Sequence, residues 1–347
     1  MSDRNIPYSE YLEAKSSVDD RSLSRSVRDA FLELIARRAK DCAENRAIRF
    51  LDAGTGTGAM VRRVIAWVDN LQPENRPVVS SYTGVDADPE SLALATTATE
   101  LLLRSLGFEV GTENLDTGTR LAGRRGNDLV ETQFFLGDLA TPDESWALPG
   151  FYHFLTAHAV FDLFPLENAV AMLKKLLVAD GALYATINYD GLTELIPCYR
   201  DRAFEERVLA WYDRTMDERP AVAMTGAGRP RDSLGGSELH PAGGSKSGRK
   251  LVEVMLQAGF ELSALGSSDW VVAPKNGNYP DRERIFFAKI LSLIHNEAMR
   301  SPVFDQTEVE RWYDSRRLAI DRSELVLIVH QIDLLAARRD NTAAAGS

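Results

Sequence analysis

Residues 51–60, LDAGTGTGAM, place three glycines two apart directly after an apolar run. Because glycine has no Cβ, such a turn can adopt positive φ and lets the backbone come close to a ligand. Gly54, Gly56 and Ala59 fit the dinucleotide pattern G-x-G-x-x-G/A, whose backbone holds a pyrophosphate at a helix N-terminus. An acid, Asp52, stands two residues before the first glycine. The turn therefore indicates a ligand site without identifying the ligand.

Other polar side chains follow apolar runs that read as strands. Asp86 ends VVSSYTGVD, Asp138 ends LVETQFFLGD, and His158 and Asp162 come at and after the end of FYHFLTAH. A carboxylate in the position of Asp86 can accept hydrogen bonds from both hydroxyls of a ribose. Ligands of open α/β sheets bind at the carboxyl ends of the strands, so His158 and Asp162 are expected to face that cleft. A buried histidine with satisfied hydrogen bonds is the alternative for His158.

Strands and helices must alternate to position these residues. The patterns predict strands over 47–54, 78–88, 129–138, 151–160, 181–188, 261–272 and 323–338. They predict helices over 8–44, 58–71, 89–106, 165–180, 199–218 and 249–260, two more within about 280–320, and a loop or hairpin over 111–127. This alternation is typical of a doubly wound parallel sheet.

The chain divides into a core and segments added to it. We expect an N-terminal helical arm over 1–46, a core over 47–190, an insertion that forms a cap over 191–250, a completion of the core over 251–335 with its helices at about 280–320, and a frayed tail over 336–347. The regular pattern stops after Asn188, where the insertion begins.

Composition and charge narrow the classes of function. A hydrophobic content of 44% with 26% charged residues is typical of a globular chain. A net charge of −11 opposes a phosphate backbone, so a nucleic acid is disfavoured as a partner. Cys42 and Cys198 form no pattern of pairs, and the polar N-terminus does not resemble a signal peptide, so we expect a cytoplasmic protein without a membrane span. His153 and His158 lie five residues apart without a cluster of carboxylates or cysteines in sequence, and no metal site is predicted.

The chain resembles the class I S-adenosylmethionine (SAM) dependent methyltransferases over roughly residues 47–190 and 251–335. Four stretches carry the resemblance in order: FLDAGTGTG, GVDADPESL, FFLGDL and LTAHAVFDLFP. VEVMLQAGFEL also resembles the late helix, turn and strand of the family. The resemblance implies a Rossmann-like, seven-stranded mixed sheet, with the arm and insertions as a cap, and methyltransferase activity of the EC 2.1.1 class.

The resemblance also implies which residues contact SAM. The glycine turn would hold the methionine part, Asp52 the ammonium side, Asp86 the ribose, and Asp138 the adenine amino group. An arginine on the arm would pair with the carboxylate of SAM. The implied cofactor-binding residues are Asp52, Ala53, Gly54, Thr55, Gly56, Gly58, Asp86, Ala87, Asp138, Leu139, Ala157 and Arg21.

A nicotinamide cofactor is the main alternative to SAM. In a dinucleotide fold the acid that binds the ribose falls about 20 residues beyond the glycines. Asp86 lies 28 residues after Gly58, and a phosphate-binding site gives Asp138 no role. These observations favour SAM and leave an NAD(P)-dependent oxidoreductase as the second interpretation.

The sequence says less about the methyl acceptor than about the cofactor. The sulfonium of SAM is already activated, so transfer depends largely on holding the acceptor in line, and a base is needed only for a protonated acceptor. The candidates for acceptor chemistry are His158, Asp162 and Tyr189. The N-P-P-Y signature of amino-group methylation is absent, since AHAV stands there, so O- and N-methylation both stay open. We expect a small or medium-sized, polar or anionic metabolite, with a protein or RNA methyltransferase as the alternative.

Residues 225–248 carry seven glycines together with several basic side chains. The segment leaves from the carboxyl side of the strand expected at 181–188, so it reads either as a lid over the acceptor site or as a passive linker.

Overall fold

The computed structural model of the chain describes residues 8–41, 47–115, 118–218, 224–225, 229–230, 242–280 and 282–339. Within them, ten strands form one sheet in the order β10-β12-β7-β6-β1-β2-β5-β4-β3, with β11 paired to β12. The glycine-rich segment 225–248 lies mostly outside the described residues, so the choice between lid and linker stays a prediction. Among the described residues, no helix has the length and apolar character that crossing a membrane requires.

The elements follow the predicted alternation. The strands of the large sheet are β1 (Ile48–Ala53), β2 (Val79–Asp86), β3 (Glu109–Leu115), β4 (Gly118–Arg125), β5 (Asp128–Leu136), β6 (Tyr152–His158), β7 (Leu177–Ile196), β10 (Phe260–Ser267), β11 (Trp270–Val272) and β12 (Val326–Arg338). The α-helices are α1 (Tyr8–Ser22), α2 (Arg25–Asp41), α3 (Ala59–Asp69), α4 (Pro89–Ser105), α5 (Leu166–Leu176), α6 (Arg202–Asp217), α7 (Ser247–Gln257), α8 (Glu283–Met299) and α9 (Gln306–Asp321). Two short strands, β8 (Met224–Thr225) and β9 (Arg229–Pro230), pair with each other in a separate two-stranded sheet.

The centre of the sheet is parallel and one edge is not. Strands β5, β2, β1, β6 and β7 run parallel, β12 is antiparallel to β7, and β10 is antiparallel to β12. The expected seven-stranded mixed sheet is therefore present. It grows to ten strands through the hairpin of β3 and β4, which was predicted as a loop or hairpin, and through β11.

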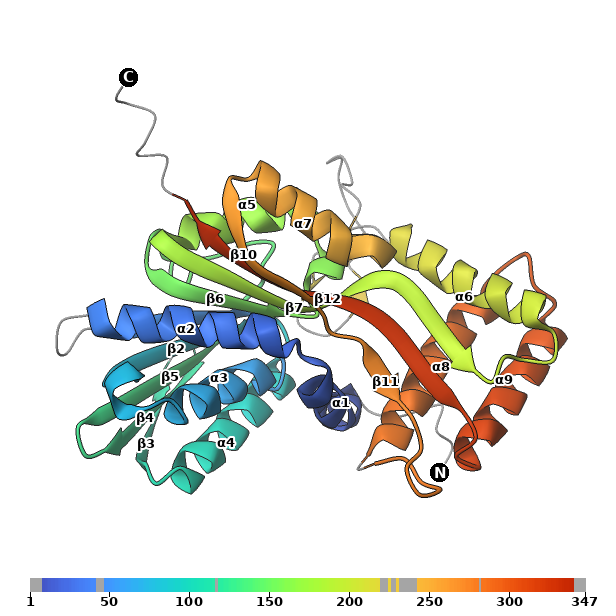
Figure 1. Cartoon of the computed structure of the whole chain (residues 1–347), viewed down its shortest axis with the longest axis horizontal. Helices are drawn as coiled ribbons and strands as arrows, with labels where there is room; N and C mark the ends of the chain where they lie inside the picture. The colour runs from blue at the N-terminus through green and yellow to red at the C-terminus, as the bar shows by residue number, and fades with distance from the viewer. Residues whose placement is uncertain are drawn as a thin grey trace.

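Helices cover both faces of the sheet because alternate side chains of each strand point to opposite sides. Phe154 packs with the apolar side chains of α2, α3 and α4 on one face, and Leu155 packs with those of α5 and α7 on the other. Figure 1 shows these two helical layers with the sheet between them. Buried on both faces, β6 reads as an almost continuous apolar run.

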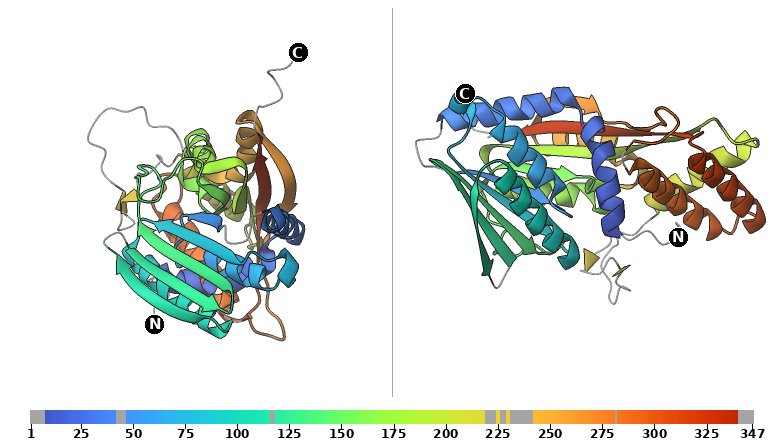
Figure 2. Two further views of the ribbon diagram at one scale, coloured as in Figure 1. Left: turned by 90° about the vertical axis from the view of Figure 1, so that its left-hand side faces the viewer. Right: turned by 90° about the horizontal axis from the view of Figure 1, so that it is seen from below.

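Two strands extend past the sheet and build a second group of helices. The pairing of β7 with β12 continues to Ile196 and Val326, beyond the point where β6 ends. Helices α6, α8 and α9 pack with this extension around a core that includes Leu195, Trp312 and Phe287. Figures 1 and 2 show the long ribbon joining the two parts, with α1 between them.

Two sequence predictions need correction at this ribbon. The regular pattern was expected to stop after Asn188, but β7 continues to Ile196 because β12 supplies a partner for the added residues. The helix predicted over 165–180 ends at Leu176, and residues 177–180 begin β7. The amide of Phe151 donates to the Leu176 carbonyl, which fixes this point of change.

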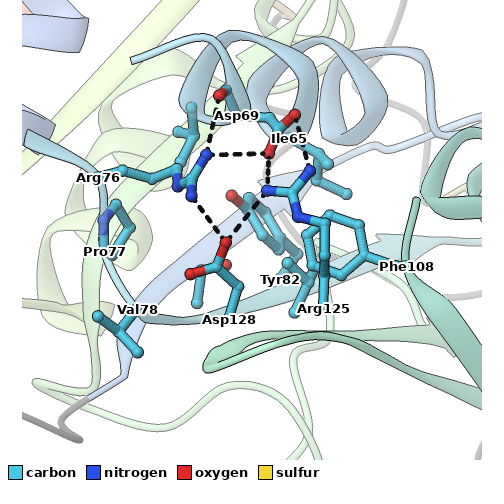
Figure 3. A pocket seen from close by; sticks show the side chains of 12 residues that line it. Ile65, Asp69, Arg76, Pro77, Val78, Tyr82, Phe108, Arg125 and Asp128 are labelled. Atoms are coloured by element: carbon cyan, nitrogen blue, oxygen red, sulfur yellow. Dashed lines mark hydrogen bonds and ion pairs between the residues drawn. The ribbon is translucent and has the colours of Figure 1, made fainter. Parts of the chain in front are cut away.

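A network of two acids and two arginines closes the amino end of β2 and β5 (Figure 3). Asp69 accepts hydrogen bonds from Arg125, whose Nη2 lies 2.5 Å from Asp69 Oδ1, and from Arg76 at 3.5 Å. Asp128 accepts from both arginines, at 2.8 Å from Arg76 and 3.1 Å from Arg125. The network joins α3 to the amino ends of the strands, at the end of the sheet opposite to the glycine turn.

Replacing Asp69 with asparagine is expected to lower the free energy of unfolding by about 1–2 kcal/mol, because the two arginines lose one of their two charged acceptors. Ligand binding should be unchanged, since the network lies at the other end of the strands. Urea unfolding monitored by circular dichroism measures the first effect. A variant as stable as the wild type would show that the network contributes nothing.

Candidate cofactor site

The glycine turn links β1 to α3 in a conformation that only glycine adopts easily. Gly54, Gly56 and Gly58 have φ of 70°, 51° and 72°, in the left-handed region. The amides of Gly54 and Thr55 donate to the Val85 carbonyl of β2, at 3.0 and 2.9 Å. A Cβ on Gly58 would lie only 2.9 Å from the Cβ of a residue in α4. Backbone conformation and close helix packing thus both require glycine here.

Asp52, the last residue but one of β1, is buried beneath the turn. Its two oxygens accept hydrogen bonds from the hydroxyls of Thr55, at 2.7 Å, and Thr156, at 2.6 Å. Burial raises the pKa of Asp52 to about 6, although both hydroxyl bonds lower it in part. Asp86 contributes to the rise because its charge is close by. The two neighbouring carboxylates therefore favour the binding of a cation at the turn.

Asp86 ends β2 beside the turn, where the sequence predicted it. Its Oδ2 accepts from the amide of Gly56 at 2.7 Å, and its Oδ1 accepts from the amide of Asp88 at 3.0 Å. Burial raises its pKa, while these backbone bonds lower it in part. Asp88 itself caps α4 by accepting from the amides of Glu90 and Ser91. Asp86 is therefore not needed as the cap of that helix.

Residues that follow β5 and β6 converge on the first glycine. A Cβ on Gly54 would collide with the side chain of Val160 and would lie 3.9 Å from Cδ1 of Leu139. Asp138, next to Leu139, is half-buried, and its Oδ1 accepts from the amide of Ala140 at 2.8 Å. Ala157 is buried in β6. The glycine turn, the loop after β5 and the end of β6 thus meet at one edge of the sheet.

A cluster of buried polar groups joins the end of β6 to the N-terminal arm. His158 Nε2 lies 2.9 Å from Asp19 Oδ2 and 3.3 Å from Lys15 Nζ, and its Nδ1 lies 2.7 Å from the Thr186 hydroxyl. Asp19 also accepts from Lys15 at 2.7 Å and from the indole of Trp270 at 2.9 Å. We call these five residues the arm cluster.

Charge in the arm cluster is shared unequally. Burial alone would raise the pKa of Asp19, but Lys15 and His158 hold it well below its usual value, so the carboxylate is charged. Burial, together with the charge of Lys15, lowers the pKa of His158 to about 4, although Asp19 raises it in part. His158 is therefore neutral at pH 7, with both ring nitrogens engaged. Burial also lowers the pKa of Lys15, while Asp19 and the nearby Asp162 raise it in part.

Helix α1 lies over the glycine turn. Cδ1 of Leu12 is 3.9 Å from the position that a Cβ on Gly56 would take. Arg63 of α3 donates to Asp20 at 2.6 Å and to the Ser16 carbonyl at 3.3 Å. The helix is thus fixed to the residues that follow the turn.

Comparisons with known proteins give only a distant likeness. No family model matches the chain, and no curated protein matches it. Among solved structures, the YcgJ protein from Bacillus subtilis is 14% identical with a TM-score of 0.40, covering 89% of this chain and 98% of its own. A SAM-dependent methyltransferase from Methanosarcina mazei is 13% identical (TM-score 0.38; 84% and 92% covered), and geranyl diphosphate C-methyltransferase from Streptomyces coelicolor is 9% identical (TM-score 0.37; 90% and 79% covered). Likenesses this weak assign no activity to the chain.

The topology of the sheet decides the fold class. An all-parallel dinucleotide fold has no counterpart to β12, the antiparallel strand inserted between β7 and β10. This strand, together with the glycine turn after β1 and the acid at the end of β2, matches the resemblance seen in the sequence. The chain has a Rossmann-like α/β fold with a mixed sheet. The predicted doubly wound, Rossmann-like architecture is thereby confirmed.

Two of the predicted site residues are held by contacts elsewhere in the fold. Arg21 forms an ion pair with Glu283 and donates to the Val271 carbonyl at 3.0 Å, so it is held toward α8 and β11. Tyr189 donates to Asp213 of α6 at 2.6 Å. The other predicted cofactor residues surround the turn or end the strands next to it: Asp52, Ala53, Gly54, Thr55, Gly56, Gly58, Asp86, Ala87, Asp138, Leu139 and Ala157.

Of the five residues of the arm cluster, only His158 was predicted as a site residue. Asp19 stands four residues after Lys15, which is the spacing of an ion pair on one helix face. That spacing was an available signal for Asp19. Thr186 and Trp270 gave none, since each is one polar or aromatic residue inside a strand.

Proposed function

We propose that this protein transfers a methyl group from SAM to a small-molecule acceptor. The observation that carries the proposal is the pair of carboxylates at the glycine turn, Asp52, which is buried, and Asp86, which is half-buried. SAM brings an ammonium and a sulfonium to such a site and has no phosphate. A cation offsets the cost of keeping two nearby carboxylates charged.

The same turn is poorly suited to a dinucleotide. A pyrophosphate would need free backbone amides at the turn, but the amide of Gly56 donates to Asp86 at 2.7 Å. The pyrophosphate would also meet the charges of Asp52 and Asp86. Both features favour SAM over NAD(P).

A small acceptor is favoured by the position of α1. The helix covers the glycine turn and packs against both the core and α8, and its contacts include the buried arm cluster. A protein or RNA substrate would have to displace this helix to reach the methyl group. We propose that the acceptor is a polar metabolite, with Asp162 and His158 at the end of β6 on its side of the site.

Ligand screening tests the proposed function. Calorimetry and thermal shift of the full chain with SAM, S-adenosylhomocysteine, NAD⁺ and NADP⁺ should show binding of the first two alone. Mass spectrometry of the protein as purified should detect the same ligands if they are retained. Binding of NAD(P)⁺ with no response to SAM would overturn the proposal.

SAM affinity is expected to fall as the pH drops below about 6. The pKa of Asp52 is raised to about 6, so its carboxyl is charged above that pH and becomes protonated below it. The lost attraction for the ammonium group should raise Kd by about tenfold per pH unit below the pKa. Affinity should be constant above pH 7. Calorimetry between pH 5 and 8 measures this dependence.

The variant Asp52→Asn provides the control for this pH dependence. It removes the titrating group and keeps the side-chain size, so the part of the slope due to Asp52 should disappear. Asp86 also has a raised pKa, and any remaining slope is assigned to it. A wild-type Kd that is constant from pH 5 to 8 would contradict the role given to Asp52.

A further inference from the structure

Asp333 lies opposite a bulge in β7, at the carboxyl end of the parallel strands. Ala185 pairs with Leu334 and Asn188 pairs with Ile332, so two residues of β7, Thr186 and Ile187, face Asp333 alone. An extra residue of this kind interrupts the ladder and redirects side chains, and bulges of this type are often found beside active sites.

The carboxylate of Asp333 replaces the missing partner in the ladder. Its Oδ1 accepts from the amide of Ile187 at 2.7 Å, and its side chain is fully buried. Ile187 has φ of 57°, a left-handed conformation that a β-branched residue seldom adopts. Such strain persists only where the surrounding structure enforces it. The Asp333 carboxylate is the side-chain group that binds the strained amide.

The other oxygen of Asp333 reaches the N-terminal arm. Its Oδ2 accepts from the amide of Ser24 at 2.8 Å. Ser24 connects α1 to α2, and its carbonyl accepts from the amide of Arg28 in α2. The position of Ser24 therefore helps to fix the end of α1, the helix that lies over the glycine turn.

Both connections lead to the same histidine. Thr186, directly before the strained residue, bonds to Nδ1 of His158 at 2.7 Å. Asp19, five residues before Ser24 on the arm, bonds to Nε2 of His158 at 2.9 Å. One carboxylate thus fixes the two segments that hold the two ring nitrogens of His158.

We propose that Asp333 is a positioning residue that sets the orientation of His158 at the methyl-transfer end of the site. It acts through the bulge on one side of the ring and through the arm on the other. The consequence for turnover rests on the proposed function, whereas the positioning itself does not. Asparagine has one carbonyl oxygen, so it can accept from only one of the two amides, and its NH₂ group would face the second amide. Asp333→Asn should therefore release at least one of the two segments.

Hydrogen exchange and NMR test the positioning without any ligand. In Asp333→Asn, the amides of Ile187 or Ser24 should exchange at least about tenfold faster than in the wild type, the equivalent of one lost hydrogen bond. The pKa of His158, followed by its ring resonances, should rise from about 4 toward its ordinary value as water reaches the ring. Unchanged exchange at both amides and an unchanged His158 titration would overturn the proposal.

Two further variants separate positioning from general loss of stability. Thr186→Val keeps the shape of the side chain and removes one partner of His158, so it should shift the His158 titration and leave the Ser24 amide protected. It also tests the path from the bulge to the ring if Asp333→Asn does not fold. Asp69→Asn lowers stability at the far end of the sheet and should change neither readout. A shift in Asp69→Asn equal to that in Asp333→Asn would show that the effect is merely loss of stability.

Activity is measured separately, at saturating SAM, once an acceptor is in hand. Asp333→Asn should lower kcat with little change in the Kd for SAM. If the wild type bound no SAM at all, the proposed function would fail, while the exchange and titration results would still decide the role of Asp333.

Discussion

Replacing Asp19 with alanine is expected to lower the free energy of unfolding by about 3–5 kcal/mol, the cost of removing one partner of a buried ion pair. Three donors lose their acceptor at once: Lys15 Nζ at 2.7 Å, Trp270 Nε1 at 2.9 Å and His158 Nε2 at 2.9 Å. Lys15 and Trp270 are buried and the His158 side chain is only 11% exposed, so water has little room to replace the carboxylate without opening the arm. Urea unfolding followed by circular dichroism and tryptophan fluorescence measures the loss.

Two matched variants show whether burial is the cause. Glu13→Ala removes an acid from the same helix that pairs with Arg282 at the surface, with 58% of its side chain exposed, so it should cost less than about 1 kcal/mol. Lys15→Met combined with Asp19→Ala should cost less than the sum of the two single changes, because the double variant leaves no buried unpaired ammonium. If Asp19→Ala cost no more than Glu13→Ala, the arm cluster would have no role in holding the arm.

The sheet was predictable from sequence because each central strand carries its signal locally. The run FYHFLTAH is apolar almost throughout, as a strand buried on both faces must be, and it forms β6. The end of β7 carried no such signal, since YDGLTELI mixes polar and apolar residues without a regular period and contains a glycine. It is a strand because β12, which lies more than 120 residues away in the chain, pairs with it. Propensity cannot report a partner that distant.

The cofactor residues and the arm residues likewise differ in how far apart they lie in the sequence. Asp52 and the three glycines are close in sequence, and the turn they form is visible as a motif. His158 meets Lys15 across 143 residues and Asp19 across 139, and no spacing rule connects them. The arm was expected to reach the cofactor through Arg21, but that side chain pairs with Glu283. Charge alone does not identify the face of α1 that packs against the core, because Lys15 and Asp19 are charged and yet buried.

The arrangement gives α1 two tasks that depend on one another. The helix covers the glycine turn through Leu12 and supplies Asp19 to the histidine at the end of β6. A movement of α1 on SAM binding would expose Lys15 and His158 to water. Water would raise the pKa of both groups toward their ordinary values, since burial is what lowers them. Occupancy of the cofactor site and the protonation of the arm cluster are therefore expected to be coupled.

Replacing Asp86 with alanine is expected to weaken SAM binding by about 1.5–3 kcal/mol, roughly 10- to 150-fold in Kd, the scale of hydrogen bonds to a charged group. Asp86 is the carboxylate at the end of β2, and its oxygens already meet the amides of Gly56 and Asp88, which orient them at the turn.

Asp88→Ala is the matched control. It removes the cap of α4, which should cost about 1 kcal/mol of stability, and leaves the proposed ribose contact in place. Calorimetry with SAM measures both variants. Equal Kd values for wild type, Asp86→Ala and Asp88→Ala would remove Asp86 from the site, whereas equal losses in both variants would trace the effect to α4. A loss confined to Asp86→Ala, with S-adenosylhomocysteine weakened to the same extent, is the result that a ribose contact requires, because the two ligands differ only at the sulfur.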